Sequence, residues 1–60
     1  MSEPLSVSEA ATMLGVSHFT VRAWLRARLI PHYKLRRRIV LDRADVEAFL
    51  ARRRVEADQP

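Results

Sequence analysis

The sequence predicts a mainly α-helical fold with one small β-hairpin, in the order helix, tight turn, helix, hairpin, helix. Two stretches with apolar residues at helical spacing meet at a glycine and a serine, a stretch of alternating residues follows, and a third helical stretch comes last. The 60 residues suffice for one small domain, which buries only about 60% of the surface of its unfolded chain. We expect an N-terminal arm at residues 1–5, the domain at residues 6–54 and a flexible tail at residues 55–60.

The first predicted helix lies between Ser6 and Gly15. Ser6 is a good N-cap, and Glu9 three residues later completes a capping box. The apolar residues that follow at helical spacing are Val7, Ala10, Ala11 and Leu14. Gly15, the single glycine of the chain, stands where the end of a helix needs a left-handed residue.

The second predicted helix lies within residues 16–28 and has apolar side chains on two sides. Ser17 is its N-cap, and Phe19 projects from the outer side among arginines. The residues of the buried side are Val21 and Leu25, flanked by Trp24 as a core residue. The helical pattern ends at Ile30, because a residue before proline is pushed out of helical geometry. Two helices joined by so tight a turn form a helix-turn-helix.

Residues 32–41 alternate between apolar and polar side chains, which predicts two short strands. The turn between them centres on Arg36 and Arg37. Because tight hairpin turns favour residues that adopt positive φ, we expect a loop longer or looser than two residues. An isolated hairpin is marginally stable in water, so this one must pack on the helices, with Tyr33 beneath it.

The third predicted helix begins at the N-cap Asp42, and Asp45 in its first turn favours the helix dipole. Its apolar stripe consists of Val46, Phe49 and Leu50, and Met13 of the first helix is a further core candidate. Three arginines, Arg52 to Arg54, fall in its last turn. They serve there as caps and solubilising charges, or they contact DNA or a partner protein.

The charge of the chain is concentrated in its middle. The net charge is +4, and no acidic residue lies between Glu9 and Asp42. The basic residues of this interval are Arg22, Arg26, Arg28, Lys34, Arg36, Arg37 and Arg38. A block of one sign predicts a polyanionic partner, with nucleic acid first, and an ordinary solvated surface is the alternative.

Several classes of function are disfavoured by composition. Without cysteine there is no disulfide or thiolate metal site, and two histidines alone do not make a zinc site. The neighbours Ser17 and His18 are not a catalytic triad, and a single glycine cannot build a glycine-rich phosphate loop. No apolar run approaches the roughly 20 residues of a membrane span, and residues 1–6 lack a signal-peptide pattern. We expect a cytoplasmic protein that is not an enzyme and uses no metal, cofactor, small-molecule ligand or membrane.

The ordered pieces of the sequence resemble a known family. They are L-S-V-x-E-A-A-x-x-L-G-V-S, T-V-x-x-W-L-R, L-I-P-x-Y-K, R-R-I and D-x-E-A-F-L, which together cover residues 5–50. This set resembles the phage excisionases, or recombination directionality factors, whose domain is related to the MerR-type DNA-binding domain. Two positions depart from the family pattern: Arg36 stands where glycine is frequent in the hairpin turn, and Ala23 stands where many members have a basic residue.

The resemblance implies a winged helix-turn-helix: a helix-turn-helix, a two-stranded wing and a C-terminal helix. By resemblance, the second helix is a recognition helix in the major groove, with site residues Ser17, His18, Phe19, Thr20, Arg22, Ala23 and Arg26. The wing would touch the backbone or an adjacent minor groove through Lys34, Arg36, Arg37 and Arg38. Such proteins bind repeats of double-stranded DNA at an attachment site, bend it, associate cooperatively there and assist a tyrosine integrase. A small MerR-like transcriptional regulator and a protein-interaction module are the alternatives.

Some roles stay open from the residues alone. Arg22 and Arg26 lie one turn apart, and either one can pair with a guanine or grip a phosphate. Ser17 and Thr20 stand at a helix start, which favours a phosphate but also explains Ser17 as a plain N-cap. Phe19 either touches a thymine methyl or a sugar, or folds back over Gly15 to seal the turn.

Overall fold

The computed structural model describes residues 2–55. Its elements in chain order are β1 (Pro4–Leu5), α1 (Val7–Leu14), α2 (His18–Arg26), β2 (Tyr33–Leu35), β3 (Arg38–Asp42) and α3 (Arg43–Arg52). The predicted winged helix-turn-helix is confirmed, with three helices and an antiparallel hairpin in the expected order. Apart from Val55, the predicted tail lies outside the described residues.

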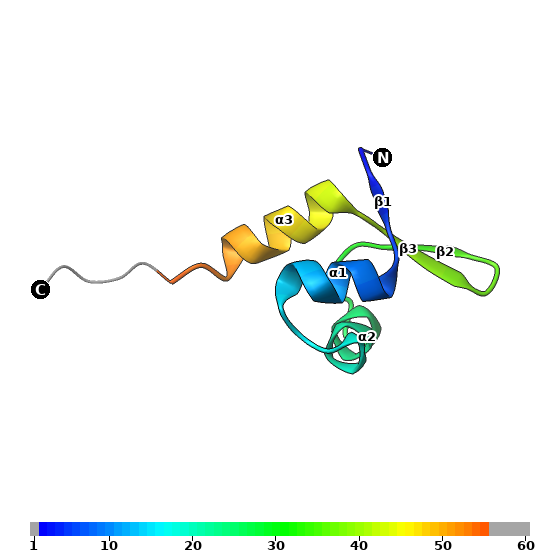
Figure 1. Ribbon diagram of the computed structural model, residues 1–60, viewed down its shortest axis with the longest axis horizontal. Helices are drawn as coiled ribbons and strands as arrows, with labels where there is room; N and C mark the ends of the chain where they lie inside the picture. The colour runs from blue at the N-terminus through cyan, green and yellow to red at the C-terminus, as the bar shows by residue number, and fades with distance from the viewer. Residues whose placement is uncertain (1, 56–60) are drawn as a thin grey trace, which may run out of the picture.

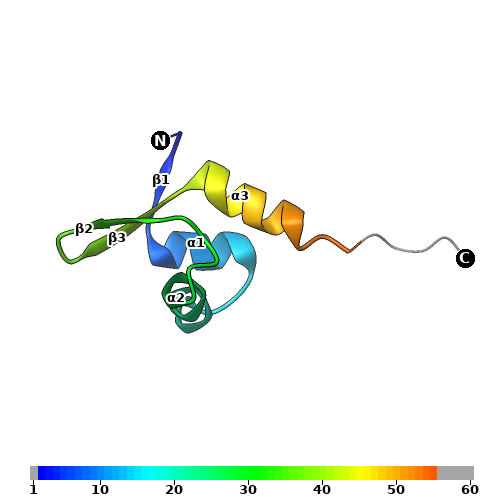
Figure 2. The ribbon, with the colours of Figure 1, turned by 180° about the vertical axis from the view of Figure 1, so that it is seen from behind.

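The helices form one body from which the hairpin extends. In Figure 1, α2 is seen along its axis below α1, and the hairpin of β2 and β3 points away from the C-terminal end of α3. The reverse view in Figure 2 shows β2 on the near side of the hairpin. Within residues 2–55, no helix has the length and apolar character that a membrane crossing requires.

The N-terminal arm forms a strand that the sequence analysis did not predict. β1 pairs antiparallel with β3, with Pro4 opposite Asp42 and Leu5 opposite Leu41, so the sheet has the order β1-β3-β2. Only two residues take part, and one of them is proline. So short a segment shows no alternation of apolar and polar residues from which a strand could be predicted. The pairing covers one edge of β3 and brings Leu5 into the core.

Helices α1 and α2 end in the same hydrogen-bonded motif. After α1, Gly15 has a φ of 71°, and the N–H of Val16 donates to the carbonyl of Ala11. After α2, the left-handed residue is Arg28, with a φ of 59°, and the N–H of Leu29 donates to the carbonyl of Trp24. Both are Schellman motifs. Helix α2 therefore ends before the predicted boundary at Ile30, and an arginine occupies the position that favours glycine.

The core is apolar and lies where the helices meet the sheet. Its buried cluster comprises Leu5, Val7, Ala10, Ala11, Val21, Leu25, Ile30, Leu41, Val46 and Phe49. Met13 and Trp24 are partly buried and pack against this cluster, as the sequence predicts for core residues. Two predictions are wrong: Leu50 is 42% exposed and Tyr33 is 44% exposed. The α3 stripe is narrower than expected, since only Val46 and Phe49 face α1 and the sheet.

The hairpin turn is tighter than predicted. Leu35 pairs with Arg38, so only Arg36 and Arg37 form the loop. Arg36 supplies the positive φ that the turn requires, at 57°. The expectation of a longer loop rested on the absence of glycine, and it is wrong because an arginine adopts the glycine-like conformation.

Asp42 is the N-cap of helix α3, as predicted, and this residue also holds the N-terminal arm. Its carboxylate accepts hydrogen bonds from the N–H of Ala44 at 3.2 Å and from the Ser2 hydroxyl at 2.6 Å. These bonds, the one from the Ser2 side chain foremost, lower the pKa of Asp42 to about 2. One carboxylate therefore caps a helix and anchors β1 beside it.

Candidate nucleic-acid interface

The outer face of α2 carries the predicted recognition residues. Val21 and Leu25 turn toward the core, with Trp24 half-buried beside them, and the opposite side of α2 faces solvent. Ser17, His18, Phe19, Arg22, Ala23 and Arg26 are exposed, and Thr20 is half-buried. The Ser17 hydroxyl accepts from the N–H of Thr20 at 3.2 Å and lies 3.1 Å from the Thr20 hydroxyl, so it is an N-cap.

Phe19 does not seal the turn between the helices. Its side chain is 71% exposed, and a Cβ built on Gly15 would meet no atom within 4 Å. The ring instead lies against the imidazole of His18, with a centroid distance of 4.2 Å and an interplanar angle of 34°. An apolar ring therefore projects into solvent at the start of α2, and of the two readings only the outward-facing one remains.

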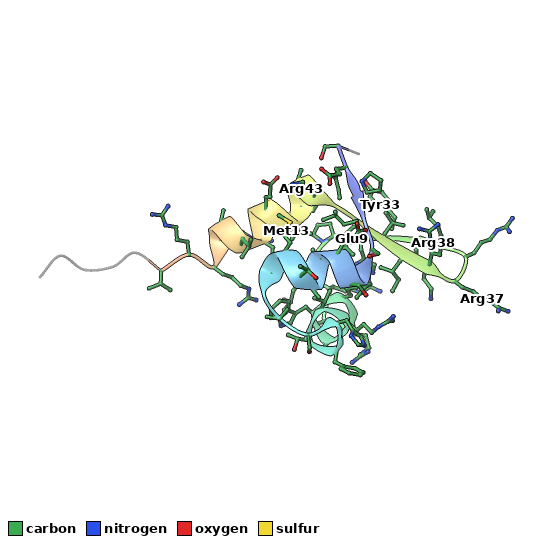
Figure 3. All side chains as sticks on the ribbon, viewed as in Figure 1. Glu9, Met13, Tyr33, Arg37, Arg38 and Arg43 are labelled. Atoms are coloured by element: carbon green, nitrogen blue, oxygen red, sulfur yellow. The ribbon has the colours of Figure 1, made fainter. Side chains whose placement is uncertain are left out.

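The hairpin carries the four predicted wing residues, all of which are exposed: Lys34, Arg36, Arg37 and Arg38. Figure 3 shows Arg37 at the outer end of the hairpin, directed away from the helices, and Arg38 nearer the helices, where β3 begins. Lys34 pairs with Ile39 across the two strands, which places both on one face of the hairpin.

A first hollow joins α2, the hairpin and the start of α1. It has a volume of about 260 Å³, and its basic residues are Arg22, Arg37 and Arg38. The remainder of its lining comprises Ile39 and residues 6–8. Arg22 of the predicted recognition helix thus shares one hollow with Arg37 and Arg38 of the predicted wing, although they are far apart in the sequence.

A second hollow lies between α2 and β2. It has a volume of about 200 Å³ and is lined by Arg22, Leu25, Arg26, His32, Lys34 and Ile39. Arg22 belongs to both hollows, so they flank one side chain. The basic residues of the two hollows lie on α2 and the hairpin, and Arg36 adds an exposed cation at the hairpin turn. We call these six residues the basic surface: Arg22, Arg26, Lys34, Arg36, Arg37 and Arg38.

The basic surface is not neutralised by the part of the chain that the structure describes. In residues 2–55, no carboxylate forms an ion pair with any of its six side chains. The ion pair between Arg43 and Glu3, at 3.5 Å, lies elsewhere, beside Glu9 on α1 (Figure 3). Cations and acids are therefore segregated, and the cations are available to a polyanion.

Three other arginines lie together in another place. Arg28 lines a third hollow, of about 390 Å³, with Arg52 and Arg53. The Arg53 guanidinium lies 4.5 Å from the ring centroid of Phe49 and 5.7 Å from that of Trp24. Of the basic block predicted from the sequence, Arg28 is thus separated from the other six. Arg53 thus lies over two aromatic rings. Helix α3 ends at Arg52, so the predicted arginines of its last turn, Arg52 to Arg54, extend beyond the end of the helix.

Sequence reasoning missed three residues of the hollows. Ser6 and Ser8 reach the first hollow because α1 packs beside the hairpin, which no local pattern reveals. His32 reaches the second hollow from the irregular segment between Pro31 and β2. Among residues 2–55, no group of three or more His, Asp or Glu side chains is placed to hold a metal ion.

Comparison with known families adds one finding. Residues 4–54 match the family described as Helix-turn-helix domain. A search of curated proteins and a search of solved structures found no match. The matched range includes all three helices, the hairpin and both hollows.

Proposed function

This chain belongs to the helix-turn-helix domain family, which indicates DNA binding, and on this premise we propose that it is a phage-type excisionase. It binds double-stranded DNA, bends it and promotes prophage excision by a tyrosine integrase. The observation that carries the proposal is the basic surface, in which α2 and the hairpin present six cations that form no ion pair with any carboxylate of residues 2–55. The protein acts by architecture and performs no chemistry of its own.

Helix α2 enters the major groove with its outer face. Arg22 and Arg26, one turn apart, contact guanine edges or phosphates there. The small side chain of Ala23 lets the helix approach the bases between them. Ser17 and Thr20 at the helix start lie where a phosphate of the groove wall is favoured.

The hairpin follows the backbone beside that groove. Lys34, Arg37 and Arg38 grip phosphates, and Arg36 at the tip reaches the adjacent minor groove, whose negative potential attracts arginine. A domain of this size buries roughly 600–1,000 Å² on DNA, so a lone copy binds weakly. Adjacent copies on repeated sites or an integrase alongside supply the remaining affinity, since multivalency raises avidity by about 10²–10⁴.

Salt dependence tests DNA binding against a protein-interaction role. Neutralising about five phosphates predicts a slope of log affinity against log salt near −4.5 on random duplex DNA. Arg37→Ala should reduce this slope by about 0.9, since one phosphate contact is lost. Arg43→Ala is the matched control: it removes the same charge beside Glu3 and should leave the slope unchanged. A flat salt response of the wild-type protein contradicts DNA binding.

An excision assay tests the finer proposal. A tyrosine integrase and its attachment-site DNA are incubated with and without this protein, and recombinant product is measured. We expect product only with the protein, and less product with Arg37→Ala. DNA binding without stimulation of excision, together with a binding site in the gene's own control region, would instead favour a small transcriptional regulator.

A further inference from the structure

We infer that His32 and the second hollow form a proton-linked phosphate site, in which a DNA phosphate is bound by the imidazolium of His32. The inference rests on the proposed DNA binding and adds a residue and a condition to it. The ligand is a phosphodiester oxygen of the strand that passes between α2 and the hairpin. His32 stands outside both the outer face of α2 and the hairpin strands.

The orientation of the imidazole is set by the backbone. His32 is half-buried, and its Nδ1 lies 3.0 Å from the carbonyl oxygen of Ile30. A carbonyl only accepts, so Nδ1 carries the hydrogen and donates it. Ile30 is 1% exposed, which makes this acceptor a fixed point of the core. Within residues 2–55, Nε2 has no hydrogen-bond partner, and it is the nitrogen left to meet a ligand.

The role of that nitrogen depends on whether the imidazole ring carries one hydrogen or two. In the neutral ring the hydrogen is on Nδ1, so Nε2 is an acceptor. Its lone pair repels the lone pairs of a phosphate oxygen, and no hydrogen bond forms. Protonation turns Nε2 into a charged donor, which a phosphate oxygen accepts. Contact with phosphate through Nε2 therefore requires uptake of one proton from solution.

The surroundings of His32 are cationic on both sides. Arg22 and Arg26 of α2 and Lys34 of β2 share the second hollow with it. On its other side, Arg28 and Arg52 line a further hollow that His32 also reaches. Among residues 2–55 no carboxylate lines either hollow, so within this part of the chain an added positive charge on the ring has no counter-ion beside it, and an arriving phosphate supplies one.

The route of the DNA leads a phosphate strand past this hollow. A major groove and the adjacent minor groove are separated by one sugar–phosphate strand. If α2 occupies the first and the hairpin tip the second, that strand runs between α2 and the hairpin, where the hollow lies. Arg22, Arg26 and Lys34 surround the phosphate, and the His32 imidazolium adds one donor on a rigid support.

The test measures affinity for random duplex DNA at constant salt between pH 5.5 and 7.5, a range in which imidazoles are the side chains that titrate. We expect binding about tenfold tighter at pH 5.5, as one charge-assisted hydrogen bond forms. His32→Gln should remove this pH dependence, and His32→Arg should bind tightly at both pH values. At pH 5.5 the salt slope of His32→Gln should be smaller by about 0.9, and at pH 7.5 the two slopes should agree.

His18→Gln is the matched control, because His18 is the other histidine and lies on α2 against Phe19. It should keep the pH dependence, whatever its effect on affinity. Loss of the dependence in His18→Gln and not in His32→Gln overturns the inference, as does wild-type affinity that is the same at both pH values. Absence of duplex binding at low salt at every pH contradicts the proposed function itself. Thermal melting of each variant checks that the domain is folded.

Discussion

The apolar ring of Phe19 lies in solvent, where it contributes no buried surface to the core. Because the ring contacts only His18 among the aromatic residues and is 71% exposed, its removal costs the fold little. In the proposed complex with DNA, we expect the same ring to touch the C5-methyl group of thymine, the apolar feature of the major groove. We therefore propose that Phe19 serves recognition and not packing.

Phe19→Ala should change the free energy of unfolding by less than about 0.5 kcal/mol and weaken preference for one thymine by about 1 kcal/mol. Preferred sites are first selected from random duplexes, and each thymine is then replaced by uracil, which lacks the methyl group. Wild-type binding should weaken at one position, and Phe19→Ala should bind both forms alike. A lower melting temperature with unchanged preference would contradict this assignment.

Asp42 makes the stability of the fold depend on pH. Its pKa is lowered from 3.8 to about 2, chiefly by the hydrogen bond from the Ser2 side chain. A carboxyl whose pKa is lowered by folding stabilises the folded state at any pH above its ordinary pKa. This stabilisation is lost as the pH falls from the ordinary pKa to the lowered pKa. Hydrogen bonds from Ser6 lower the pKa of Glu9 in the same direction.

The melting temperature of the wild-type protein should therefore fall between pH 4 and pH 2. In Asp42→Asn this fall should be smaller, because residue 42 no longer titrates while an N-cap acceptor remains. Glu9→Gln, which preserves the capping box, is the control. In this variant the part of the fall in melting temperature that is due to Asp42 should remain. An equally steep fall in Asp42→Asn would show that the link between β1 and α3 does not depend on this carboxylate.

Two elements end on an arginine in left-handed conformation. Arg28 closes α2 with a φ of 59°, and Arg36 opens the hairpin turn with a φ of 57°. This conformation costs a residue with a side chain roughly 1–2 kcal/mol, and glycine avoids the cost. At the hairpin tip the strain coincides with a position on the basic surface, whereas Arg28 lies outside that surface.

Arg28→Gly and Arg36→Gly should each stabilise the domain by about 0.5–1 kcal/mol, since relief of strain exceeds the added entropy of the unfolded chain. The melting temperature should rise by roughly 2–8 °C. Only Arg36→Gly should weaken DNA binding. Comparison of the two variants therefore separates the effect of the left-handed arginine on stability from its effect on DNA affinity. Equal DNA affinity of both variants and the wild type would remove the functional reason for an arginine at the tip.

The whole molecule depends on a small core in which every large residue matters. Leu41 is fully buried and pairs with Leu5 in the sheet, so it joins the arm, the hairpin and the helices. A domain of this length is stable by only about 3–9 kcal/mol, and a truncated buried leucine costs about 2–5 kcal/mol.

Leu41→Ala should therefore leave much of the protein unfolded near 37 °C, with a shallow, early thermal transition by circular dichroism. Leu50→Ala is the matched control, since Leu50 is 42% exposed and its loss should cost under about 1 kcal/mol. A normal transition in Leu41→Ala would mean that the sheet is not coupled to the helices.

Local patterns in the sequence were sufficient for the elements that depend on neighbours in the chain. The capping box at Ser6, the left-handed Gly15, the buried Val21 and Leu25, and the N-cap Asp42 all follow from spacings of a few residues, and the structure confirms each. The basic block also predicted a polyanion partner, because charge composition needs no fold to be read.

The remaining features were decided by contacts between distant segments. Strand β1 exists because β3 offers an edge, and Leu50 and Tyr33 are exposed because α3 and the hairpin present narrower apolar faces than their patterns suggest. Packing alone divides Arg28 from the other cations and brings His32 between α2 and β2. A sequence pattern records which face a residue takes on its own element, but not which element covers that face. For this reason the kind of partner was predictable from the chain, while the hollows that would hold its phosphates were not.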